Sequence, residues 1–295
     1  MDENTRNELI ELKKKVQKGY RVSVFLGVSL FLVIFIPVFA LTAEMEDYLC
    51  ISIVIVFLIL YTLVLVRKIM PIYEDRCKKY EKVLKETAVP QILNDCFESW
   101  SFQPEKGYTE EEFLETGIQP HRNIIEFKSS DWLEGEYKGV YFRQADLMMT
   151  CSADFNSKRS TTTVMDGEML CIHNPRYAER PVFVSTNCDF MIFNETYRYV
   201  DLEEREFNLT YRASAENQED VFYFLTPPVM ERMMELSRID KGVMFVFNKE
   251  YVYVLRDGRK GIFYVNNKGT VEQDIEHAYE DMRQIQQIID CLLQK

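Results

Sequence analysis

The chain has 295 residues, a formal net charge of −12 and a hydrophobic fraction of 47%. Residues 91–295 hold most of the acidic excess, with 22 Lys or Arg against 36 Asp or Glu, a net charge of −14. An acidic domain without a basic stripe repels phosphate backbones, so we expect no nucleic-acid partner. The seven cysteines are odd in number and form no CxxC pair, which is typical of a reducing compartment.

Residues 1–21 predict a cytoplasmic amphipathic helix, because Leu9, Leu12 and Val16 recur at helical spacing. Two segments without a charged residue follow, 22–43 and 49–66. As helices they would span about 33 Å and about 27 Å, enough for the hydrocarbon core of a bilayer. Together with the acidic loop between them they predict a transmembrane hairpin over residues 22–66, in which Pro37 is tolerated.

The distribution of basic residues predicts the orientation of this hairpin. Basic residues precede the first segment and follow the second, whereas the connecting loop has none: Arg6, Lys13, Lys14, Lys15, Lys18 and Arg21, then Arg67, Lys68, Arg76, Lys78 and Lys79. Positive charges near membrane segments stay cytoplasmic, so we expect a multi-pass protein of the inner (plasma) membrane with both termini cytoplasmic. A cleaved signal peptide at 22–43 and two buried helices of a soluble protein are the alternatives.

Residues 67–90 predict a juxtamembrane helix over 69–88, with Pro90 marking its end. Its apolar positions could pair with those of residues 1–21 to form a short stalk. Alternatively, the helix could lie in the membrane interface and extend its Lys side chains to the headgroups.

Residues 91–295 predict one cytoplasmic α+β domain of mainly antiparallel sheet, with a mid-domain helix and a long C-terminal helix. Short runs rich in β-branched and aromatic residues predict the strands, at 123–128, 136–143, 147–152, 163–173, 181–186, 207–212, 221–225, 242–247, 251–255 and 262–265. Residues 155–163 predict a polar hairpin loop between two of them, and 248–250 the turn of a tight hairpin. A short helix is expected at 92–100.

Three further helices have recognisable starts. Thr109 and Glu112 fit a capping box before a helix that ends at Glu115, and Thr226 is an expected N-cap before Pro227. Thr270 and Gln273 form a second capping box before the closing helix, residues 271–293. We expect the apolar stripe of that helix to pack along the sheet; the alternative is that its distal half, residues 285–292, meets a second subunit or a partner helix.

Residues with catalytic chemistry are few and scattered. His121, His173 and His277 lie far apart, so we assign no metal ligand, and no nucleotide, hydrolase or protease motif occurs. The turn 258–261 could hold an anion but is typical of a solvated hairpin. Cys151 and Cys171 fall on expected strands, which favours small buried hydrophobes. Acidic residues such as Asp146, Asp154, Glu203 and Glu204 are expected at the surface. We therefore assign no catalytic, cofactor-binding or metal-binding residue.

Three stretches resemble a known family: residues 97–113 (FESWSFQPEKGYTEEEF), residues 129–147 (SSDWLEGEYKGVYFRQADL) and residues 200–236, which contain Glu206-Phe207 and LTPPVME. They are similar to the uncharacterised bacterial two-span membrane proteins named domain of unknown function 3137. The likeness covers residues 20–293 and implies a hairpin before a cytoplasmic domain, without an assigned activity. This chain departs from the family at 164–166, where the expected glycine is displaced to Gly167.

Two classes of function remain. The first is an integral membrane protein whose acidic cytoplasmic domain binds a partner or serves as a scaffold, with the lipid bilayer and a protein partner or second copy as its contacts. The second is a membrane-anchored, hydrolase-like enzyme with an unrecognised site, which would need a cleft holding a perturbed carboxylate or cysteine. We favour the first, without a cofactor.

Overall fold

The computed structural model describes residues 3–41, 67, 70–120, 123–155, 158–186, 197–238 and 242–293, without the side chains of 26, 28–41, 153–155, 158–160 and 293. The expected membrane segment 49–66 and His121 lie outside the described residues. The chain forms two compact units, which are considered separately. The first unit comprises Met1–Gln91 and Val265–Glu276, and the second comprises Ile92–Tyr264 and His277–Lys295.

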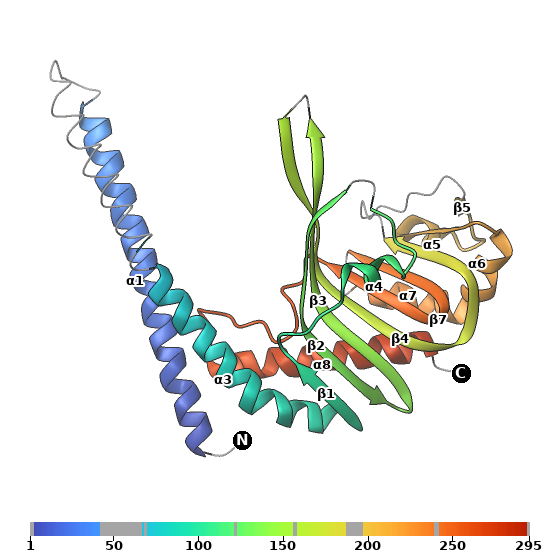
Figure 1. The fold of residues 1–295 in the computed structure, drawn as a ribbon, viewed down its shortest axis with the longest axis horizontal. Coiled ribbons are helices and arrows are strands. Elements are labelled where there is room, and N and C mark those ends of the chain that lie inside the picture. Colours follow the sequence, from blue (N-terminus) through green and yellow to red (C-terminus); the bar gives the residue numbers. More distant parts are fainter. Residues whose placement is uncertain are drawn as a thin grey trace. The chain divides into compact units, whose positions relative to one another are not determined.

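The first unit is built on two long antiparallel helices, α1 (Glu3–Leu41) and α3 (Met70–Cys96, of which 70–91 belong here) (Figure 1). Their apolar faces meet in one cluster that includes Leu9, Leu12, Val16, Tyr80, Leu84, Ala88 and Val271. Of the two alternatives for the juxtamembrane helix, the pairing of its apolar face with that of residues 1–21 is the one observed. The helix predicted over 1–21 continues without a break into the segment 22–43, which was also predicted as a helix, because α1 extends to Leu41.

The structure gives no support to the transmembrane hairpin predicted over 22–66. Among the helices of the described ranges, none is both long and apolar enough to cross a membrane.

α3 runs through Pro90, which was expected to end it. Proline removes one helical hydrogen bond, which usually stops or kinks a helix. Here Val89, Ile92 and Leu93 around the proline are at most 2% exposed. Packing of these side chains stabilises the helix past the proline, so the helix predicted at 92–100 is instead the end of α3 followed by a strand.

The second unit is built on an antiparallel sheet whose strand order is β1-β2-β3-β4-β6-β5, with β7 also paired to β4 (Figure 1). Its strands are β1 (Ser99–Gln103), β2 (Ile124–Tyr137), β3 (Val140–Phe155), β4 (Lys158–Thr186), β5 (Arg198–Val200), β6 (Tyr211–Ala215) and β7 (Val243–Asp257). β4 is the longest of these strands, with 29 residues, and it pairs with β3, β6 and β7. The predicted combination of helices and antiparallel sheet is confirmed.

Helices accompany this sheet: α4 (Glu110–Leu114), α5 (Arg205–Thr210), α6 (Gln218–Phe224), α7 (Pro227–Ser237) and α8 (Val271–Leu293, of which 277–293 belong to this unit). The closing helix has the predicted bounds. Met282 and Ile285 on it are fully buried within the single chain, so its distal half is covered by the chain itself. Its first turn belongs to the first unit, where Val271 joins the α1–α3 cluster, and this part of the sheet-docking prediction is wrong.

Two predicted strands are helices in the structure. Residues 207–212 fall mainly in α5, and residues 221–225 fall mainly in α6. The side chain of Asn217 accepts a hydrogen bond from the Glu219 amide and starts α6. Val221 and Phe224 are at most 2% exposed, whereas Phe222 and Tyr223 are 47% and 55% exposed, so the run buries one face of a helix.

The structure also differs from the prediction at 155–163 and 248–250, where hairpin turns were expected. Strand pairing continues through Phe155 opposite Lys158, so most of the expected polar loop is strand. Residues 243–257 form the single strand β7, which has a local irregularity at Lys249, where φ is 53°. The side-chain amide of the neighbouring Asn248 donates to the carbonyls of Glu115 and Thr116, and this satisfies polar backbone groups beside the irregularity. The strand predicted at 262–265 does not form, since residues 262 and 263 are turn and residues 264 and 265 are irregular.

The displaced glycine, Gly167, lies where β4 passes very close to β7. A Cβ at this position would lie 1.9 Å from the carbonyl oxygen of Arg256, too close for any side chain. The position therefore requires glycine for a steric reason.

Candidate functional site

The first unit contains a buried lysine, Lys13, on the apolar face of α1. Only 3% of Lys13 is exposed, between the buried side chains of Leu12 and Val16. Lysine is almost never buried unless it is paired, because an ammonium group loses its hydration there. The environment of its Nζ atom therefore determines whether this helix can pack.

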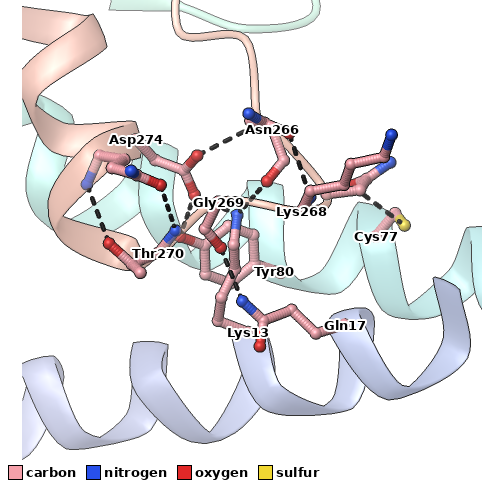
Figure 2. Close-up of polar contacts among 11 residues, drawn as sticks. Lys13, Gln17, Cys77, Tyr80, Asn266, Lys268, Gly269, Thr270 and Asp274 are labelled. Atoms are coloured by element: carbon pink, nitrogen blue, oxygen red, sulfur yellow. Dashed lines mark hydrogen bonds and ion pairs between the residues drawn. The ribbon is translucent and has the colours of Figure 1, made fainter. Parts of the chain in front are cut away.

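The partner of Lys13 is Asp274, in the first turn of α8, and the two form a buried ion pair (Figure 2). Oδ2 of Asp274 also accepts a hydrogen bond of 2.7 Å from the hydroxyl of Tyr80 on α3. Oδ1 accepts one of 3.1 Å from the backbone amide of Asn266. The carboxylate is thus surrounded by donors from three segments and lies at the positive end of its helix, which also favours negative charge.

The turn before α8 completes this arrangement. Lys13 Nζ donates to the carbonyl of Asn266 at 2.8 Å, and Gln17 Nε2 donates to the carbonyl of Gly269 at 2.8 Å (Figure 2). The predicted capping box is present, since the amide of Thr270 donates to Gln273 Oε1 and the amide of Gln273 donates to Thr270 Oγ1. One face of α1 therefore binds both side-chain and backbone groups of residues 266–274.

Tyr80 is fully buried beside this ion pair, and its pKa is raised. Burial is the main cause, because it disfavours the charged phenolate, and the Asp274 carboxylate adds to the effect. The phenol therefore stays neutral and serves as a donor. Its ring also contacts the cation, with Lys13 Nζ 4.7 Å from the ring centroid.

We name Lys13, Tyr80 and Asp274 the polar clamp, since they fasten α1, α3 and the segment 265–276 together within the first unit. Each group in the clamp is engaged by the others. Removing one partner of a buried pair typically costs about 3–5 kcal/mol, because it leaves an uncompensated charge. The chemistry of the clamp is therefore that of a structural lock.

The second unit has a groove of about 380 Å³ between β2, β3, β4 and the turn after β7. Its lining includes cationic, acidic and hydroxyl side chains: Glu105, Lys128, Ser129, Ser130, Asp146, Asp166, Arg259 and Lys260. The volume lies within the range of small-molecule sites, although the groove is polar rather than apolar. The turn that was predicted as either an anion cradle or a solvated hairpin forms one wall.

Asp146 holds that wall in place. Its Oδ1 accepts a 2.9 Å hydrogen bond from the backbone amide of Ile262. Gly261, which precedes Ile262, has a φ of +73°, and a Cβ on this residue would lie 2.1 Å from Asp146 Oδ2. Asp146 was expected at the surface, but it is half-buried and has a structural role. The side chain of Asp154 is not among those that the structure describes.

A second buried ion pair lies between the sheet and α8 in this unit. Glu168 on β4 and Arg256 on β7 are each at most 2% exposed and contact one another. Gln144 Nε2 donates to Glu168 at 2.9 Å, and Arg256 Nη1 donates to Gln284 Oε1 of α8 at 2.9 Å. Asp281, one turn before Gln284, has a pKa raised to about 7, chiefly by burial and next by the charge of Glu168.

The structure scatters the remaining sequence candidates. His173 and His277 are exposed, as expected for His277, and no group of side chains that could hold a metal ion occurs among the described residues. Cys151 and Cys171 are buried as predicted. Burial raises the pKa of Cys171, although Arg143 Nη2 donates to its sulfur at 3.4 Å.

Sequence reasoning missed the polar clamp, yet a signal was present. Lys13 is four residues after Leu9 and three before Val16, which places a cation on the apolar stripe of its helix. Asp274 similarly follows Val271 by three residues on the stripe of the closing helix. Opposite charges on two apolar stripes indicate a buried pair, because neither could be buried alone.

Comparisons with known proteins point to a family and no activity. A search of curated proteins finds no match. The crystal structure of the mycobacterial trehalose monomycolate transport factor A, TtfA, aligns with 72% of this chain and 97% of that chain, at a TM-score of 0.36 and 8% identity. That TM-score is too low to establish a shared fold. Residues 149–294 match the family described as protein of unknown function, DUF3137. The predicted resemblance to this family is confirmed over residues 149–294.

Proposed function

We propose that this protein is a membrane-anchored binding or scaffold protein. Residues 22–66 form its transmembrane hairpin in the inner membrane, and the acidic domain binds a protein partner or a second copy on the cytoplasmic side. Two segments without a charged residue, flanked on both outer sides by basic residues, support the anchor. The proposal assigns the chain no catalytic step, cofactor or nucleic acid.

The polar clamp is the observation that carries this proposal. The helices α1 and α3 are the segments that enter and leave the proposed hairpin, and the clamp fastens both to residues 265–276. An exposed ion pair would contribute little to such an attachment, but a buried pair with further hydrogen bonds is disrupted only at high cost. This is the construction expected of a permanent stalk.

Cysteine labelling tests the anchor and its orientation. In a chain whose native cysteines are replaced, Met45→Cys should react with a membrane-impermeant maleimide in intact cells, whereas Lys158→Cys should react only after lysis. The opposite pattern would place the acidic domain outside the cell and refute the proposal.

Binding is tested by cross-linking in the native membrane, followed by purification of the intact protein. We expect a partner or a second copy to be recovered in a fixed ratio to the chain. If the partner binds at the groove, Lys260→Glu, which reverses a charge in its lining, should reduce the recovered partner. Arg198→Glu reverses an exposed charge outside the groove and is the matched control. A chain that remains monomeric and without a cross-linked partner in its membrane would contradict a scaffold role.

A further inference from the structure

The helix pair of the first unit exposes large apolar side chains at one level. Val22, Val24 and Phe25 on α1 are 41%, 44% and 71% exposed, and Met70 and Ile72 on α3 are 41% and 54% exposed. We call these five residues the apolar band. Scattered exposed apolar residues are ordinary, but several gathered at one level of a helix pair are typical of an interaction site.

The contacts between the helices show that the two halves of the apolar band are level. A Cβ on Gly19 would lie 2.8 Å from the ring of Tyr73, and Lys13 lies over the ring of Tyr80. Because the helices are antiparallel, the residues just after Gly19 lie beside those just before Tyr73. The exposed parts of α1 at 22–25 and of α3 at 70–72 therefore occupy the same height.

Exposed basic residues lie directly next to the apolar band, toward the clamp. Lys14, Lys15, Lys18 and Arg21 on α1 are exposed, as are Lys78 and Lys79 on α3, and we call these six the basic band. Lys14, Lys18, Arg21 and Phe25 follow one another at helical spacing, so a cationic stripe ends in the most exposed aromatic ring of the apolar band. Lys18 and Phe25 are seven residues apart, or about 10 Å along the axis.

The charge of this region is one-sided on α1. No acidic residue occurs between positions 12 and 43, and on α3 the opposing charges at this level are Glu74 and Asp75. The six cations of the basic band outnumber these two carboxylates, although the protein as a whole is acidic. Such a local reversal of sign is attracted to a negatively charged surface.

From this geometry we propose that the two bands form a site for anionic phospholipid headgroups at the cytoplasmic leaflet. The apolar band enters the boundary between headgroups and acyl chains, and the ammonium and guanidinium groups of the basic band bind lipid phosphates. Juxtamembrane cations are each worth about 1 kcal/mol near an anionic leaflet, and their long side chains reach to the interface. This inference rests on the proposed function, because it requires the chain to be in the membrane.

Quenching by brominated lipids tests the site in the full-length protein. Phe25→Trp places a fluorophore in the apolar band, and the parent chain, with Trp100 and Trp132, supplies the background. The protein is reconstituted into phosphatidylcholine vesicles that contain 20% brominated lipid, either phosphatidylglycerol or phosphatidylcholine. We expect the brominated phosphatidylglycerol to quench the introduced tryptophan more strongly, and 0.5 M salt to bring the ratio of the two close to one.

A charge variant and its control identify the residues responsible. Lys14→Gln/Lys18→Gln/Arg21→Gln should bring the quenching ratio close to one without salt. Arg198→Gln/Arg205→Gln/Arg238→Gln removes three exposed charges from the second unit and should leave the ratio unchanged.

The outcomes separate this inference from the proposed function. Equal quenching by both lipids would show that the chain is in the membrane but does not select anionic headgroups, which overturns only the inference. Chains that float with the vesicles but are quenched by neither lipid would show that a second copy covers the apolar band, with the same consequence. Chains that do not float with the vesicles would overturn the proposed anchor itself.

Discussion

Replacing Asp281 by asparagine should change how the stability of the protein depends on pH. The Asp281 carboxyl has a pKa raised from 3.8 to about 7, first by burial and then by the charge of Glu168, against which Arg256 and Arg259 act in the opposite direction. The folded state therefore holds the proton more tightly than the unfolded state. The stability contributed by this group is complete below about pH 4 and is lost as the pH rises to about 7.

The size of the effect follows from the two pKa values. Each pH unit between them is worth about 1.4 kcal/mol, so the free energy of unfolding falls below its value in acid by about 1.5 kcal/mol at pH 5 and about 4 kcal/mol at pH 8. At pH 5 this loss arises because the carboxyl is ionised in the unfolded state and still protonated in the folded state. Asp281→Asn removes this loss and keeps an oxygen that can accept from the amide of Phe263, the donor to Asp281 Oδ2 at 3.4 Å. Its stability advantage over the parent should widen by about 2–3 kcal/mol between pH 5 and pH 8.

Denaturant unfolding followed by tryptophan fluorescence measures this gap, since Trp132 is buried in the second unit. Glu276→Gln makes the same charge change at an exposed position of α8, and its gap to the parent should stay constant. If the stability difference between Asp281→Asn and the parent stays constant or narrows with rising pH, the carboxylate is ionised in the folded state without a free-energy penalty. The assignment of its raised pKa to burial beside Glu168 would then be wrong.

Three other substitutions test the packing. Lys13→Met should destabilise the protein by about 3–5 kcal/mol in denaturant unfolding, because it leaves the Asp274 carboxylate buried without its cation. Adding Asp274→Leu should restore much of this loss, and a double variant as unstable as Lys13→Met would show that the unpaired carboxylate is not its cause. Gly167→Ala should lower Tm strongly because no Cβ fits beside β7. Gly242→Ala should be tolerated, because a Cβ there would lie 3.5 Å from its nearest neighbour, and equal Tm values for the two variants would contradict the steric argument. Thr226→Ala should change the unfolding free energy by less than about 0.5 kcal/mol, since its side chain makes no capping hydrogen bond, and a loss of 1 kcal/mol or more would restore the N-cap prediction.

Elements with local signals could be predicted from the sequence. The capping box at Thr109 forms with Glu112, and the box at Thr270 forms with Gln273, because each depends on residues within one turn. The apolar repeat of α8 likewise extends over 23 residues, long enough to be unambiguous. The same logic failed at Thr226, which is an N-cap by its backbone while its side chain makes no capping hydrogen bond.

Short or strongly packed elements could not be predicted in this way. The helix α5 has six residues and α6 has seven, too few for a helical repeat to be distinguished from a strand. The course of α3 past Pro90 and the single strand β7 depend on tertiary contacts. The partner of Lys13 is 261 positions away, so the sequence indicates that a buried cation needs a partner but not which carboxylate provides it.

That separation has a consequence for the order of assembly during synthesis. A ribosome makes α1 and α3 long before Asp274, so both helices leave the translation machinery before the counter-ion of Lys13 exists. Until then the ammonium group must stay hydrated, which keeps the facing apolar surfaces from closing tightly. A chain interrupted after Tyr264 would have both helices and yet lack the residue that completes their packing, so the first unit finishes folding only after nearly all of the second has been made.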